Sequence, residues 1–174
     1  HAAALGKKTD EVLITAMEAG ANATDAGDAT AAWDFDTAMS VVTRFSVNEV
    51  PDDGQRYCAL HPYAWAQFLK VNEFANADYV GQDALPFKGG MTAKFWMGVL
   101  WFPLPNVSLS AGNVATNLMW HRSSVGHGVN SEINTIWDYE NTRSAWSCVS
   151  SMSLGAKVIE DTGIYKVSTL SAAP

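Results

Sequence analysis

The stretch VPDDGQRYCALHPYAWAQFL, residues 50–69, combines a turn, a short strand and the start of a helix. Pro51 restricts the backbone of the turn, and Gly54 is free to take a positive φ. Residues 56–60 are apolar and short, as expected of a strand. Pro62 ends the strand and suits the first turn of a helix, whose apolar face has i, i+3, i+4 spacing: Trp65, Phe68 and Leu69. The stretch predicts a strand followed directly by an amphipathic helix, and it contains no catalytic motif.

Composition indicates a globular, acidic protein. Of the 174 residues, 48% are hydrophobic and seven are tryptophan, which indicates large buried areas in cores or subunit interfaces. The net charge is -7 and the basic residues are scattered, which argues against a nucleic-acid groove. No apolar run approaches the ~18 residues of a membrane span, and no signal peptide is expected. Cys58 and Cys148 lie in strand-like runs, so buried, reduced thiols are favoured over a disulfide.

Two helices are predicted before this stretch. Residues 2–21 place apolar side chains at helical spacing and are rich in alanine, with Gly20 as the expected end. Residues 36–48 repeat the pattern, with Asp34 or Asp36 as the N-cap. Residues 22–32 are rich in Ala, Thr, Gly and Asp, and predict a connector between the two helices.

The second half of the chain predicts strands. Residues 91–104, MTAKFWMGVLWFPL, are too apolar for a half-exposed strand and predict one central strand covered on both faces. Extended or polar loops are expected at 72–90 and 107–115. Side chains alternate between two faces in residues 132–139 and 146–154, with Ile133, Thr135, Trp137 and Tyr139 on one face. A polar turn at 138–143 lies between these two strands, which predicts that they pair as an antiparallel ribbon. Residues 155–167 predict a strand, a tight turn at 161–163 and a closing strand.

The order of these segments resembles the major capsid (coat) protein of tailed bacteriophages with the Hong Kong 97 (Johnson) fold. The resemblance rests on several stretches: DEVLITAM at 10–17, VPDDGQRYCALHP at 50–62, ADYVG at 77–81, FWMG at 95–98, TNLMWHRSSVGHGV at 116–129 and GAKVIEDTGIYKV at 155–167. It implies an α+β fold, in which a long spine helix and a β-ribbon form a peripheral domain and a mixed sheet flanked by helices forms an axial domain. Residues 1–32 would then be spine helix and connector, residues 33–119 the axial domain, and residues 120–174 peripheral strands and C-terminus.

The resemblance also implies a function. It predicts a structural subunit of an icosahedral shell, which self-assembles into hexamers and pentamers around packaged DNA. Its partners would be copies of itself, with scaffolding, portal or decoration proteins as further partners, but no sequence-specific nucleic acid and no membrane. Its location would be the virion, after assembly in the host cytoplasm.

The chain begins at His1 within a helical pattern, and the arm and extended loop that precede the spine helix in the family are missing. The sequence therefore looks like a piece of a longer protein that assembles poorly by itself. An encapsulin or a gene-transfer-particle shell protein of the same fold is one alternative function. A small β-rich ligand-binding module that uses the aromatic surface is another.

Catalytic, cofactor-binding and metal-binding residues are not predicted, and each candidate group has a plainer interpretation. His121, His127 and Glu132 do not match a zinc spacing. Ser123 and Ser124 lie near His127 but lack the G-x-S-x-G turn of a hydrolase. The acidic pairs Asp34/Asp36 and Asp52/Asp53 lack the offsets of a calcium loop and suit a cap and a turn. The glycine pairs 89/90 and 126/128 do not open a phosphate-binding βαβ unit.

Overall fold

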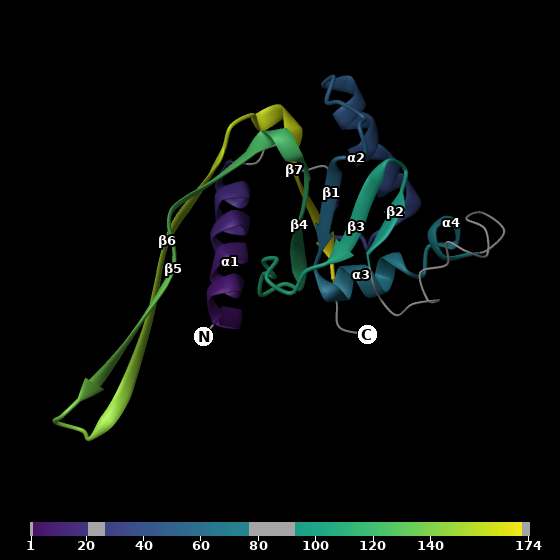
Figure 1. The fold of residues 1–174 in the computed structure, drawn as a ribbon. Coiled ribbons are helices and arrows are strands. Elements are labelled where there is room, and N and C mark those ends of the chain that lie inside the picture. The colour runs from purple at the N-terminus through teal and green to yellow at the C-terminus, as the bar shows by residue number, and fades with distance from the viewer. Residues whose placement is uncertain (1, 21–26, 77–92, 172–174) are drawn as a thin grey trace.

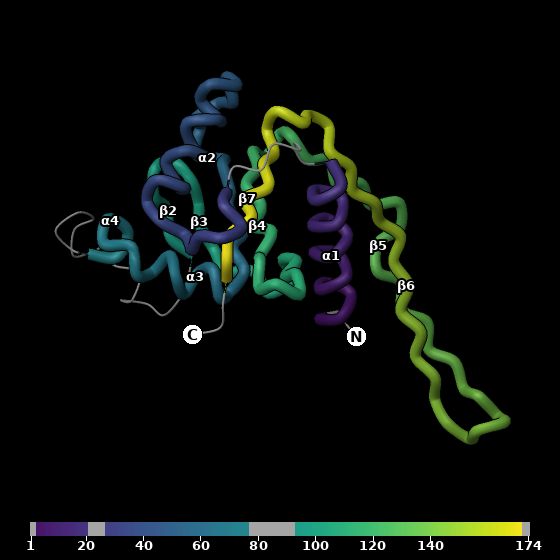
Figure 2. Tube along the Cα trace, turned by 180° about the vertical axis from the view of Figure 1, so that it is seen from behind, coloured from purple at the N-terminus to yellow at the C-terminus, as the bar shows by residue number. Residues whose placement is uncertain are grey.

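The computed structural model describes residues 2–20, 27–76 and 93–171, which form a body built on a sheet and a long ribbon that projects from it (Figure 1). The body contains a five-stranded mixed sheet in the order β2-β3-β1-β4-β7, and the ribbon consists of β5 and β6. Seen from behind, α1 stands between the sheet and the near half of the ribbon, whereas α2, α3 and α4 lie on the side of the body away from the ribbon (Figure 2). The predicted α+β class is confirmed.

Helix α1 (Ala2–Gly20) ends at the glycine that the sequence indicated. Its buried residues Ile14 and Met17 pack in a cluster with Leu118 and Ile164 of the sheet. At Gly20 the helix lies so close to β6 that a Cβ would be 2.6 Å from Val158 Cγ2. A side chain at this position would push the helix off the ribbon, so the glycine permits close contact as well as ending the helix.

Helix α2 (Phe35–Val47) has a defined N-cap. The Asp34 carboxylate accepts a hydrogen bond from the Thr37 backbone N–H at 2.7 Å, so Asp34 rather than Asp36 is the cap. The face formed by Ala38, Val41 and Phe45 is completely buried. The helix therefore covers the sheet with the apolar positions that its periodicity predicted.

Strand β1 (Arg56–Leu60) is the centre of the sheet. It pairs in parallel with β3 (Val99–Pro103) and antiparallel with β4 (Val114–His121). Helix α3 (Pro62–Phe68) starts directly after β1, with the His61 side chain as its cap. Trp65, Phe68 and Leu69 are buried, as the spacing predicted. A parallel pair such as β1 and β3 requires a crossover connection, and this strand–helix stretch begins it.

Aromatic side chains fill the core of the body. Phe68 is central: its ring centroid lies 4.3 Å from Phe74, 4.9 Å from Trp101 and 5.5 Å from Trp33. The rings meet at tilted or edge-to-face angles, which is the favourable geometry for aromatic pairs. We call this group the aromatic cluster: Trp33, Trp65, Phe68, Phe74, Trp96 and Trp101. Besides Trp33, the cluster contains five aromatic residues, which come from α3 and from the elements that follow it in the chain.

Two sequence predictions in this region are wrong. Residues 94–103 are not one central strand but a hairpin of β2 (Lys94–Trp96) and β3, which turns at Met97 and Gly98 with φ values of 52° and 74°. The turn divides the continuous apolar run into two strands. Strand β2 is therefore at the edge of the sheet, and Phe95 is exposed. The predicted loop at 72–90 begins with a short helix, α4 (Asn72–Ala75), because burial of Phe74 stabilises it. Residues 77–92 lie outside the described part of the chain.

Strand β7 (Ile164–Leu170) closes the sheet by pairing with β4 from Val114↔Leu170 to Trp120↔Ile164. The sequence grouped residues 120–174 together, but this pairing places residues 164–170 in the body sheet. Asn117 is completely buried, and its side chain connects β4 and β7 to the end of β1. Its Oδ1 accepts from the His61 N–H at 2.9 Å, and its Nδ2 donates to Val167 O at 3.1 Å.

Candidate interaction surface

The ribbon is longer than the sequence indicated. Strand β5 (Val125–Glu140) pairs antiparallel with β6 (Ala145–Val158) as far as Glu140↔Ala145, so only residues 141–144 form the turn instead of the predicted 138–143. At about 3.3 Å per residue a strand of this length reaches roughly 50 Å. The predicted antiparallel pairing is confirmed, and the ribbon extends toward the body through residues that the alternating pattern did not cover.

Two irregularities interrupt the pairing, and both place an extra residue in β5. Val129 and Ser131 face Leu154 and Ser153, and Ser131 and Asn134 face Ser153 and Ser151. Such bulges bend the strand and increase its twist. Beyond them Thr135, Trp137 and Tyr139 lie opposite Ser150, Cys148 and Trp146, so these three share a face as predicted. Ile133 falls inside the second irregularity.

Helix α1 covers only the near half of the ribbon. It packs against β6, whose alternate residues toward the body, among them Leu154, Ala156 and Val158, are half-buried. Both views show the ribbon continuing well past the N-terminal end of α1 (Figures 1 and 2). No described helix accompanies its distal half, residues 133–152.

The distal half exposes large apolar side chains on both faces. One face, here called the aromatic face, carries Trp137 (68% exposed), Trp146 (70%) and Tyr139 (44%). The rings of Tyr139 and Trp146 are 5.3 Å apart across the strands. The opposite face, here called the aliphatic face, carries the paired residues Ile136 (58%) and Val149 (62%). Apolar surface of this extent is typical of sites that contact other proteins.

Two short turns form the neck between ribbon and body. Turn η2 (Arg122–Ser124) leads from β4 into β5, and η3 (Asp161–Gly163) leads from β6 into β7. The Ser124 carbonyl accepts from the Ile159 N–H at 2.9 Å. A Cβ on Gly163 would lie 2.9 Å from Ser124 Cβ and still closer to its hydroxyl, so the two turns are in tight contact.

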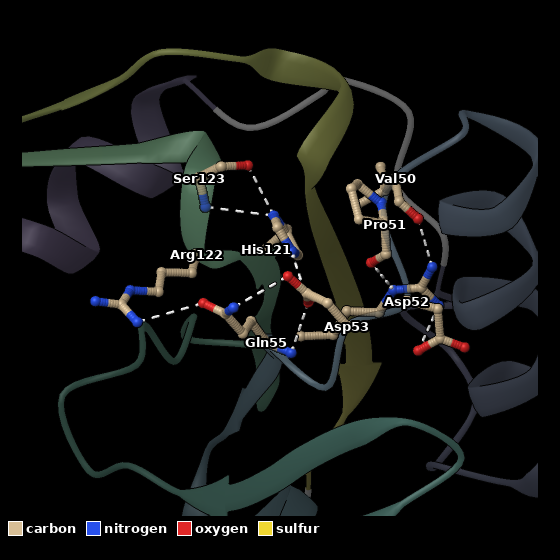
Figure 3. Close-up of polar contacts among 9 residues, drawn as sticks. Val50, Pro51, Asp52, Asp53, Gln55, His121, Arg122 and Ser123 are labelled. Carbon is tan, nitrogen blue, oxygen red and sulfur yellow. Dashed lines mark hydrogen bonds and ion pairs between the residues drawn. The ribbon is translucent and has the colours of Figure 1, made fainter.

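His121 holds the neck to the loop before β1 (Figure 3). Its ring is 4% exposed, with Nε2 3.1 Å from Asp53 Oδ1 and Nδ1 2.7 Å from Ser123 Oγ. The hydrogen bond from His121 is the main cause of the lowered pKa of the Asp53 carboxyl. Ser, His and Asp are the residue types of a hydrolytic triad, but there the Asp binds Nδ1 and the Ser binds Nε2. Here Nδ1 also accepts from the Ser123 N–H at 3.3 Å, so the histidine caps the turn η2.

We call the contacts of His121 with Asp53 and Ser123 the anchor, and Arg56 and Gln55 complete it. Arg56 is buried, donates from Nε to Pro51 O at 3.0 Å and from Nη2 to Val50 O, and lies 3.8 Å from the Asp52 carboxylate. The Gln55 carbonyl accepts from the Arg122 N–H at 3.1 Å. Sequence reasoning treated residues 51–54 as a simple turn, and it missed the contacts of Asp53 with His121 and of Gln55 with Arg122, which are 68 and 67 positions away. The one local signal is a lone arginine at the start of an apolar strand.

The candidate residues from the sequence do not converge. His121 is buried in the anchor, His127 is exposed on β5 opposite Ala156, and Glu132 lies in the second irregularity. Among residues 2–20, 27–76 and 93–171, no group of three or more His, Cys, Asp or Glu side chains is placed to hold a metal ion. Gly126 and Gly128 lie in the ribbon, Gly128 opposite Gly155, and Gly89 and Gly90 fall outside the described residues.

Both cysteines are free thiols, but their surroundings differ. Cys58 in β1 is fully buried, which raises the pKa of its thiol well above the ordinary value. Cys148, expected to be buried, is only half-buried, because no helix among the described residues covers this part of the ribbon. None of the helices in the described part of the chain has the length and apolar character needed to cross a membrane.

The model of the phage capsid protein family matches residues 1–170. The chain belongs to this family. Among solved structures, a chain of Mycobacterium phage Che8 matches with a TM-score of 0.75 at 17% identity, over 99% of this chain and 61% of that one. The capsid structure of cyanophage P-SCSP1u matches with a TM-score of 0.69 at 15% identity, over 97% and 63%. The SrpI encapsulin complex from Synechococcus elongatus matches with a TM-score of 0.59 at 16% identity, over 97% and 61%.

These likenesses establish the fold as the Hong Kong 97 type that the sequence resemblance predicted. The chain spans about three fifths of the length of these solved chains. No curated protein matches the chain.

Proposed function

We propose that this capsid-family chain belongs to the structural subunit of an icosahedral phage shell, which assembles with copies of itself into hexamers and pentamers around packaged DNA. The observation that carries the proposal is the distal ribbon. It projects from a well-packed body and exposes Trp137, Trp146, Ile136 and Val149, which a monomer in water would leave unburied. A family of shell proteins supplies the reason for such a surface, because every subunit of a shell is surrounded by others.

Within this subunit we assign α1 and the ribbon to the peripheral domain and the five-stranded sheet with α2–α4 to the axial domain. The pairing of β7 with β4 supports placing residues 164–170 in the axial domain and starting the peripheral return at the neck. We assign no catalytic, cofactor-binding or metal-binding role. Further proposed partners are scaffolding, portal or decoration proteins, and the proposed location is the virion after assembly in the host cytoplasm.

An encapsulin-type shell is the second candidate function, favoured by the fold likeness to the Synechococcus encapsulin complex. The two candidates differ in what the particle encloses. A phage shell contains DNA, whereas the alternative particle contains protein cargo. The family match makes a small ligand-binding module unnecessary as an explanation of the exposed aromatic residues.

Electron microscopy of the product of the intact gene tests the proposal. Closed particles with pentameric and hexameric clusters are the expected result, and nuclease treatment of opened particles identifies DNA as the content. A product that remains monomeric or dimeric under all assembly conditions would contradict the proposal. Particles that contain a protein and no nucleic acid would favour the encapsulin-type function.

A further inference from the structure

The loop at residues 51–55, between α2 and β1, makes contacts that alternate between two sides along its sequence. Asp52 and Gly54 face the β2–β3 hairpin. A Cβ on Gly98, at the hairpin turn, would lie 2.8 Å from Asp52 Oδ1. A Cβ on Gly54 would lie 4.0 Å from Phe95 Cζ in β2. These two residues of the loop therefore lie against the turn and the edge strand of the hairpin.

Asp53 and Gln55 face the other way, toward the neck of the ribbon (Figure 3). Asp53 Oδ1 lies 3.1 Å from His121 Nε2. Gln55 contacts Arg122 twice, because its carbonyl accepts from the Arg122 N–H at 3.1 Å and its Oε1 accepts from Arg122 Nη1 at 3.3 Å. In Figure 3 the Asp52 carboxylate lies on the opposite side of the loop from these groups. The loop thus joins the hairpin to the neck.

We propose that the 51–55 loop couples the β2–β3 hairpin to the neck, so that displacement of the hairpin edge loosens the hold of the body on the ribbon. The inference concerns coupling within one chain and does not depend on the proposed shell function. Phe95 is 57% exposed on the edge strand, so it is the part of this arrangement that another molecule can reach. A partner that moves Phe95 changes how firmly the ribbon is held without touching the ribbon.

Internal hydrogen bonds make the loop move as a unit. Pro51 restricts the backbone, and its carbonyl accepts from Nε of the buried Arg56 at 3.0 Å. The Asp53 carboxylate accepts from the Gln55 N–H at 2.9 Å and from Gln55 Nε2 at 3.1 Å. Coupling between sites is carried by packed side chains and hydrogen-bond networks of this kind. Because these bonds fix the shape of the loop, a shift of its hairpin side also moves its neck side.

The hairpin turn is strained, and this ties it to the loop. Met97 and Gly98 form a two-residue turn with φ values of 52° and 74°. A positive φ at both positions suits glycine but strains methionine. A strained residue keeps its conformation only when its surroundings hold it, and such residues are frequent in switch regions. Here the surroundings include the Asp52 carboxylate against Gly98, so the turn and the loop do not move independently.

A second route between hairpin and neck runs through the sheet, because β1 pairs with both β3 and β4. The experiment must therefore separate the loop from the strand ladder. Phe95 and Leu100 are paired in the hairpin, and Leu100 is also paired with Tyr57 of β1. Truncating Leu100 disturbs the ladder, whereas truncating Phe95 removes the ring beside Gly54.

Amide hydrogen exchange of the 174-residue chain, followed by NMR, tests the inference. The probes are the Arg122 N–H, which is bonded to the loop, and the Ile159 N–H, which is bonded across the neck. We expect Phe95→Ala to speed exchange of both amides by at least about threefold, within the range typical of coupling between sites. The matched variant Leu100→Ala should leave both rates unchanged after correction for global stability, which urea unfolding gives for each variant.

Coupling is reciprocal, so a change at the neck should reach the hairpin. His121→Ala removes the ring that Asp53 contacts, and we expect faster exchange of the amides of residues 94–101. Unchanged neck amides in Phe95→Ala overturn the inference, as does a hairpin that does not respond to His121→Ala. An equal response to Leu100→Ala overturns it as well, because the coupling would then run through the sheet. Phe95 is mostly exposed, so its truncation leaves the fold intact and this test holds whether or not the His121 variant folds.

Discussion

The body and the ribbon both contain large aromatic residues on strands, but the body buries them and the distal ribbon exposes them. Trp101 on β3 is completely buried and contacts Phe68, whereas Trp146 on β6 is 70% exposed and its ring lies beside that of Tyr139 on the neighbouring strand. Both are tryptophans on strands. The difference is that α2 and α3 supply a second layer for the body, while α1 supplies one for only the near half of the ribbon. The comparison shows that a second layer, rather than composition, decides which aromatic residues form a core and which remain available to a partner.

The ribbon retains its shape without a full core because it is supported at one end. A two-stranded hairpin alone is marginally stable in water. Here the near half packs on α1 at Gly20 and Val158, and the neck is held by the hydrogen bond from Ile159 N–H to Ser124 O. We therefore expect the stability of the molecule to depend on body and neck, and association to depend on the distal ribbon.

The largest expected effect comes from truncating the centre of the aromatic cluster. Phe68→Ala removes a fully buried ring that packs against five others, and we expect it to lower the free energy of unfolding by about 3–5 kcal/mol. Trp146→Ala removes a larger side chain but should cost at most about 1 kcal/mol, because most of its surface is already in water. Urea unfolding of both variants gives the comparison, and equal losses would show that the ribbon is part of the cooperative core.

Sequence reasoning identified the elements whose signals are local. The helix after Pro62, a cap at Asp34 or Asp36 and the common face of Thr135, Trp137 and Tyr139 follow from spacing within a few residues, and the structure has the helix, the cap at Asp34 and the common face. The hairpin at Met97 and Gly98 was missed because a continuous apolar run hides a turn whose φ values alone reveal it. Neither the position of β7 beside β4 nor the bulges in β5 could be predicted, since pairing between distant strands is set by the whole sheet.

The sequence predicted only part of the candidate interaction surface, because local spacing does not show how distant segments pack together. Alternation indicated which ribbon residues share a face but not whether a helix covers that face. The length of α1 relative to the ribbon decides this for the aromatic residues, and Ile136 and Val149 are exposed on the opposite face. The anchor of His121 and Asp53 was not predicted, because it joins residues 68 positions apart. Family resemblance supplied the fold, while the residues of the surface came from the structure.

A second experiment tests the neck that joins the two regions. Gly163→Ala places a Cβ against Ser124, and we expect a loss of about 1–3 kcal/mol in unfolding free energy from overpacking. The double variant Gly163→Ala with Ser124→Gly removes the clash and should recover most of the loss. A double-mutant cycle from urea unfolding measures the coupling. Additive losses would show that the two turns are not in tight contact.

The cap of α2 provides a smaller effect that is confined to the body. Asp34→Ala removes the acceptor of the Thr37 N–H, and we expect a loss of about 1 kcal/mol in unfolding free energy. Asp34→Asn keeps an oxygen acceptor and should cost less. Asp36→Ala, in the first turn but outside the cap, is the matched control and should change stability by only a few tenths of a kcal/mol. Thermal unfolding followed by circular dichroism resolves the series, and an equal effect of both alanine variants would contradict the role of Asp34.

The smallest effect is a dependence of body stability on pH through His61. Its Nδ1 accepts from the Tyr63 N–H at 3.3 Å, and partial burial lowers the pKa of its imidazole below the ordinary value of 6.5. The unfolded chain therefore takes up a proton on this residue at a higher pH than the folded chain does. The sign follows: stability is complete above about pH 6.5 and falls as the pH decreases toward the lower folded pKa. Because His61 is partly exposed, the change should be under about 1 kcal/mol. His61→Asn keeps a capping acceptor without a titrating group, so its midpoint in urea should vary less between pH 7 and pH 5 than that of the wild-type chain. An identical pH dependence in both proteins would remove His61 as the cause.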